Sequence, residues 1–92
     1  MTRLMEAEQA EERIREVEGD LRFCEQLLRK EARMELVKMI LEDLIKEVKS
    51  IVEAGLPENL RERVLDIEFR IRVLYHRANA LLSLQEESKN SF

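Results

Sequence analysis

The chain has 92 residues and a formal net charge of −4, with 39% charged and 4% aromatic residues. This negative balance provides no general attraction to nucleic acid or to anionic membranes. Only two glycines and one proline interrupt a sequence rich in glutamate, arginine and leucine, which is typical of helices and coiled coils. We therefore expect an all-α fold, with one domain over residues 1–86 and a flexible tail over 87–92.

Cys24 is the single cysteine, so the chain cannot form an internal disulfide and its folding needs no oxidising compartment. The N-terminus lacks the apolar core of a signal peptide, and no apolar run is long enough to span a bilayer. These features predict a cytoplasmic protein that binds no membrane and no cofactor.

The first helix is expected over about residues 3–54, with Thr2 as a possible N-cap. Its first half carries apolar residues at alternating steps of three and four: Ala7, Ala10, Ile14, Val17, Leu21, Cys24 and Leu28. Acidic and basic residues four apart should form ion pairs along its surface: Glu11–Arg15, Glu18–Arg22 and Glu25–Arg29.

Two irregularities interrupt this helix. Gly19 costs about 1 kcal/mol relative to alanine in a helix interior, and a break there would give three helices. The apolar spacing keeps its phase across Gly19, however, which favours a continuous helix. Leu28 and Met34 are six residues apart where a heptad needs seven, which predicts a local change in supercoiling.

The stretch Met34–Val52 is the most apolar part of the chain and organises the rest of it. Its apolar positions cover roughly half of the helix circumference, which is wider than one helix–helix contact requires. We therefore expect this stretch to pack against at least two neighbouring helices. A small-molecule groove lined by Met34 and Met39 is the alternative interpretation.

A turn over residues 55–57 separates the first helix from a second one over about residues 57–85. Gly55 suits the left-handed residue that ends a helix, and Leu56 can fold back onto the preceding turn. Pro57 suits the first turn of the next helix. Because the connection is so short, the two helices should be antiparallel neighbours in a helical hairpin.

The second helix is apolar on two opposite sides. One regular seam should face the first helix: Leu60, Val64, Ile67, Ile71, Leu74, Ala78 and Leu81. The other side carries a second line of apolar residues: Leu65, Phe69, Val73, Ala80 and Leu84. Since one hairpin partner covers one side, we expect Leu65, Phe69, Val73 and Leu84 to bind a partner.

Helix lengths predict a second partner-binding region at the N-terminus. At 1.5 Å per residue the first helix would span about 75 Å and the second about 42 Å. The first 25 or so residues would then project without an intrachain partner, and Ile14, Val17 and Leu21 would contact another chain. We expect a homodimer, or a complex with a helical protein, that completes a helical bundle.

Motifs for metal binding and for catalysis are weak. Glu-x-x-His pairs build metal sites in helical bundles, but the single histidine, His76, has Val73 three residues before it. No phosphate-binding glycine loop or serine elbow occurs in the sequence. The sequence therefore predicts neither a metal site nor a cofactor site.

A basic run on the second helix supports two alternative functions. Arg70, Arg72 and Arg77 could bind nucleic acid. The segment from Arg70 to His76 also formally resembles the R-x(4–6)-H pattern of HEPN-type ribonucleases, and this resemblance implies catalytic roles for both residues. Ile71 departs from the polar residue that usually follows the arginine in that family. Acidic residues four positions earlier can pair with Arg70 and Arg72, so we favour a non-catalytic protein–protein interaction module.

Overall fold

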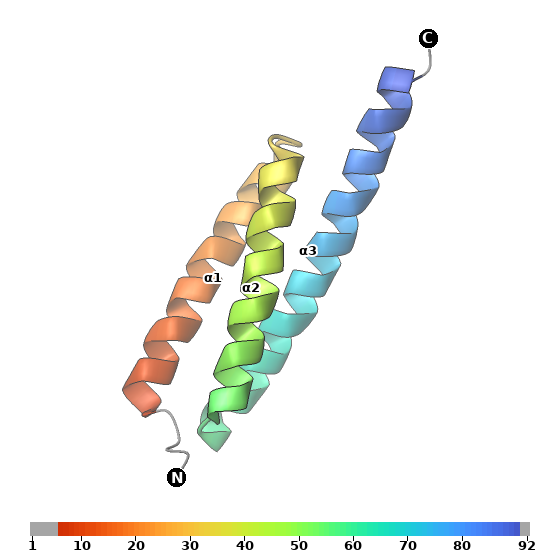
Figure 1. Cartoon of the computed structure of the whole chain (residues 1–92). Helices are drawn as coiled ribbons and strands as arrows, with labels where there is room; N and C mark the ends of the chain where they lie inside the picture. The colour runs from red at the N-terminus through yellow and green to blue at the C-terminus, as the bar shows by residue number, and fades with distance from the viewer. Residues whose placement is uncertain (1–5, 91–92) are drawn as a thin grey trace.

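The computed structural model describes residues 6–90 and contains three helices: α1 (Ala7–Arg29), α2 (Met34–Ala54) and α3 (Glu58–Asn90). Consecutive helices run in opposite directions along the molecule (Figure 1). The all-helical prediction is confirmed. The proposed cap at Thr2 lies outside the described residues.

The prediction of one helix over residues 3–54 is wrong, because the chain turns back between α1 and α2. Glu31 takes the left-handed conformation with φ 50°. The N–H of Glu31 donates to the carbonyl of Leu28, and the N–H of Ala32 donates to the carbonyl of Leu27. These two bonds form a Schellman motif, which satisfies carbonyls at the end of α1 without the glycine that usually occupies the left-handed position.

The break does not occur at Gly19, which lies inside α1 as expected. The turn between α2 and α3 lies at residues 55–57, as predicted. Gly55 has a positive φ of 93°, but its ψ of 129° is outside the left-handed helical region that was expected. Leu56 packs against the hydrophobic core. Pro57 directly precedes α3 rather than lying within its first turn.

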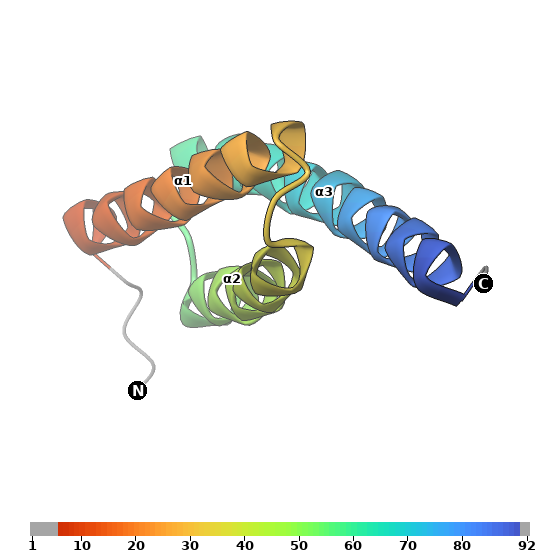
Figure 2. The ribbon, with the colours of Figure 1, turned by 90° about the horizontal axis from the view of Figure 1, so that it is seen from above.

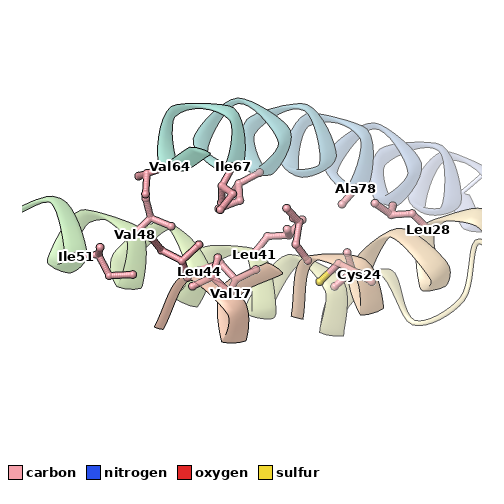
Figure 3. Close-up of a cluster of buried hydrophobic side chains, with 14 of the residues drawn as sticks. Val17, Cys24, Leu28, Leu41, Leu44, Val48, Ile51, Val64, Ile67 and Ala78 are labelled. Atoms are coloured by element: carbon pink, nitrogen blue, oxygen red, sulfur yellow. The ribbon is translucent and has the colours of Figure 1, made fainter. Parts of the chain in front are cut away.

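One apolar core lies between the three helices. The labelled side chains from all three helices point toward this shared interior (Figure 3). Fully buried residues include Leu21 and Leu28 on α1, Val37 and Leu41 on α2, and Ile71 on α3. They fall at the three–four spacing of each helix, which places them on a single stripe.

The central helix α2 contacts both α1 and α3, which confirms the prediction from its wide apolar arc. The contact between α1 and α3 is smaller. In Figure 2, α2 lies on one side of α1 and α3, in the lower part of the picture. With α1 folded back on α2 and α3, the described part of the N-terminal region does not project as the sequence suggested.

The projecting segment belongs to α3 instead. This helix has 33 residues whereas α2 has 21, so its C-terminal part extends past the connection between α1 and α2 (Figure 1). Ala78 is the last fully buried residue of α3 among those whose side chains are described, and Leu84 is exposed. The helix continues to Asn90 rather than ending near residue 85.

Candidate interaction surface

The side of α3 that faces away from α1 and α2 carries four exposed apolar residues, Leu65, Phe69, Val73 and Leu84, here called the outer row. Their side chains are 62%, 66%, 49% and 61% exposed, respectively. Each step of four residues turns the direction by about 40° and the step of eleven by about 20°, so the row winds over about 100° of one side of the helix. This is the face that the sequence placed opposite the seam.

The side of α3 opposite the outer row is buried against the other helices. Ile67 and Ile71 alternate with the row along α3 and are 2% and 1% exposed. The intrachain core therefore uses one stripe of α3 and leaves the other without a described contact. Contiguous exposed apolar side chains of this size are characteristic of protein-interaction sites.

A small hollow continues the outer row toward α1. Its volume is about 140 Å³, and Phe69 and Val73 form part of its lining together with Leu74 and the charged residues Glu25 and Arg70. This hollow gives the row a concave border.

A larger groove runs between α2 and α3, with a volume of about 450 Å³. It is lined by apolar and charged residues from both helices: Ile45, Val48, Lys49, Val52, Glu53, Glu68, Ile71 and Arg72. Ile45 and Val52 lie seven residues apart on α2 and are half exposed. Both belong to the apolar arc of Met34–Val52 that was expected to pack against neighbouring helices; their position at the edge of this arc is the signal that could have identified them as exposed.

The N-terminal part of the predicted interface is wrong. Ile14, Val17 and Leu21 were expected to contact another chain, but they are at most 2% exposed and belong to the chain's own core. The reason is the break after Arg29, which allows α1 to pack against α2 and, to a smaller extent, α3. These residues are therefore not available to a partner in the folded chain.

The acidic residues of α1 pair with α3 more than with α1 itself. Glu18 accepts from Arg63, and Glu25 accepts from Arg70, both across the α1–α3 contact. Of the three predicted pairs within α1, only Glu11–Arg15 is present, at 3.3 Å. Sequence spacing alone could not distinguish these arrangements, because each carboxylate lies within reach of two cations.

These ion pairs bear on whether the basic run of α3 could bind nucleic acid or act as a nuclease site. Arg70 is half buried and is paired with Glu25, whereas Arg72, His76 and Arg77 are exposed. Arg70 and His76 are six residues apart, which turns their side chains about 120° away from each other on a helix. The three arginines therefore do not form one continuous basic patch, and Arg70 and His76 do not share one direction.

The other candidate ligand residues are also separated. Met34 is buried while Met39 is 64% exposed, so the two methionines do not line one groove. Cys24 is buried in the core, as expected of a small apolar residue, and burial raises the pKa of its thiol to about 11. Within residues 6–90 no three histidine, cysteine or acidic side chains are grouped so that they could hold a metal ion.

In the described part of the chain no helix has the length and apolar character needed to cross a membrane. Comparison with family models, with curated proteins and with solved structures finds no match to this chain.

Proposed function

We propose that this chain is a non-catalytic protein–protein interaction module that binds a helical partner through the outer row. The observation that carries the proposal is the simultaneous burial of one stripe of α3 and exposure of large apolar side chains on the opposite one. A cytoplasmic location fits the proposal, because the buried single thiol of Cys24 needs no oxidising environment.

Energetics favour a covered outer row. Fully burying one large apolar side chain contributes roughly 1.5–3 kcal/mol, so covering Leu65, Phe69 and Val73 contributes several kcal/mol to association. Phe69 is the best anchor, since it is the aromatic member of the row and lies next to the hollow between α1 and α3. A helix is the natural occupant, because a row at helical spacing matches the apolar stripe of another helix.

The test compares three glutamate variants. Phe69→Glu places a charge at the centre of the outer row and should abolish association while the helical circular dichroism is unchanged. Met39→Glu is the matched control, since Met39 is equally exposed but lies on α2, outside the row. Ile71→Glu buries a charge in the core and should unfold the chain.

Association is measured by sedimentation equilibrium and by capture of other proteins on the immobilised chain. The proposal predicts that complexes formed by the wild type and by Met39→Glu are lost in Phe69→Glu. Two results would contradict the proposal: association that survives in Phe69→Glu, or a wild type that forms the same complexes as Phe69→Glu or none at all.

A further inference from the structure

The exposed charges beside the outer row change sign along α3. On the N-terminal side of Phe69, three acidic residues and one basic residue are exposed: Glu58, Glu62, Asp66 and Arg61. On the C-terminal side, up to Ala80, two basic residues are exposed: Arg72 and Arg77. Phe69 therefore lies between a half with net charge −2 (one minus three) and a half with net charge +2.

The remaining charged residues of this segment point toward the other helices. Arg63 pairs with Glu18, and Arg70 pairs with Glu25, so both cations are engaged by α1. Glu68 lines the groove on the α2 side and is half-buried, and the exposed Arg72 lies at the edge of the same groove. The change of sign is thus a property of the surface that surrounds the outer row.

Building on the proposed function, we propose that the partner is a second copy of this chain, whose α3 lies antiparallel on the first with the two-fold axis beside Phe69. In this arrangement a residue a given number of positions before Phe69 lies opposite the residue the same number after it. Phe69 then meets Phe69 of the second copy, and Leu65 meets Val73 of the second copy. Both apolar layers are complete without any other protein, whereas Leu84 lies beyond the paired segment.

The same register also joins opposite charges. Glu62 lies opposite His76 of the second copy and can accept a hydrogen bond from its imidazole. On one flank of the helix pair Arg77 of the second copy comes beside Glu62 and Asp66. On the other flank Arg61 comes near Arg72 of the second copy, a like-charge contact that the two acidic neighbours of Arg77 outnumber. In a parallel arrangement each acidic residue would instead face its own counterpart, and like charges directly opposite repel.

Within residues 6–90, α1 and α2 both pack on the opposite side of α3 and leave this face open (Figure 1). The segment from Glu58 to Ala80 would supply about 34 Å of helix to the contact. Isologous pairing about a two-fold axis is also the commonest way in which soluble proteins form oligomers.

Disulfide crosslinking between single-site cysteine variants tests the direction of pairing. Glu62→Cys and His76→Cys are prepared as separate chains, mixed and oxidised. The antiparallel dimer should give the mixed product, which joins one chain of each variant, in at least several-fold excess over either product that joins two identical chains. Two residues 14 positions apart are about 21 Å apart along a helix, whereas a disulfide requires Cα atoms within about 7 Å. Native Cys24 is buried and should not compete.

Charge reversal provides a second test in the intact chain. Asp66→Arg and Arg77→Glu should each weaken the dimer, measured as an increased Kd in sedimentation equilibrium. A triple variant that also carries Glu62→Arg reverses all three charges at this contact and should restore the Kd to nearly the wild-type value. Failure of the triple variant to recover would overturn the antiparallel register.

The outcomes separate this inference from the proposed function. A wild type that stays monomeric at several hundred micromolar overturns the second copy as partner, and capture by the outer row then decides the proposed function alone. A dimer in which each cysteine variant crosslinks only to its own kind overturns the antiparallel arrangement but retains the outer row. A dimer unaffected by Phe69→Glu contradicts both, since this change should raise its Kd by more than about tenfold.

Discussion

The two glycines of the chain should respond in opposite ways to replacement by alanine. Gly19 lies in the interior of α1, and a Cβ atom there would have no neighbour within 4 Å. Alanine is favoured over glycine by about 1 kcal/mol in a helix interior, and the open site adds no clash that would offset this gain. For a domain of this size, about 1 kcal/mol corresponds to a rise in Tm of about 4–8 °C.

Gly55 provides the matched control, because its φ of 93° is a conformation that an L-residue side chain opposes. Gly55→Ala should therefore lower the free energy of unfolding by about 1 kcal/mol or more. Thermal and urea unfolding, followed by circular dichroism at one protein concentration, measures both variants. A Gly19→Ala protein with an unchanged or lower Tm would refute the continuous helix through residue 19.

Three further predictions follow from the fold. Deleting residues 1–17 removes half of α1 from the core, so circular dichroism should show loss of cooperative unfolding; a stably folded remainder would contradict the packing of α1. Arg33→Gly should raise the free energy of unfolding by up to about 1 kcal/mol in urea titrations, because Arg33 has a left-handed φ of 54°. Burial raises the pKa of the Cys24 thiol from 9.0 to about 11, so the unfolded chain loses this proton first as pH rises. The contribution of Cys24 to stability is present below about pH 9 and is lost through about pH 11; Cys24→Ala should show a smaller loss of stability over that interval.

The connection between α1 and α2 is the element that could not be predicted from the sequence. Residues 30–33 are Lys, Glu, Ala and Arg, all of which favour helices, and none is a glycine or proline. The visible signal was the six-residue step from Leu28 to Met34, which is equally compatible with a distorted continuous helix. Folding back buries the apolar stripe of α1 against α2 and α3, and this tertiary gain outweighs the local preference for helix and the strain at Glu31 and Arg33.

The sequence predicted the exposed apolar residues of α3 more accurately than the environment of the apolar residues of α1. Periodicity alone separates Ile67 and Ile71 from Phe69 and Val73, because the two sets lie on opposite sides of any helix with this sequence. It does not reveal which other segment covers a stripe. Val17 and Phe69 both belong to regular apolar rows, and only the position of the turns decides that one is buried and the other exposed.

The central position of α2, in the chain as well as in the fold, has a kinetic consequence. Connections of four and three residues join it to α1 and α3, so either helical pair can form by closing a small loop before the third helix docks. Most tertiary contacts then join neighbouring helices in the chain, a topology associated with folding in microseconds to milliseconds. Substitutions in α2 would slow both routes, whereas those in α1 and α3 would report how the folding flux divides between them.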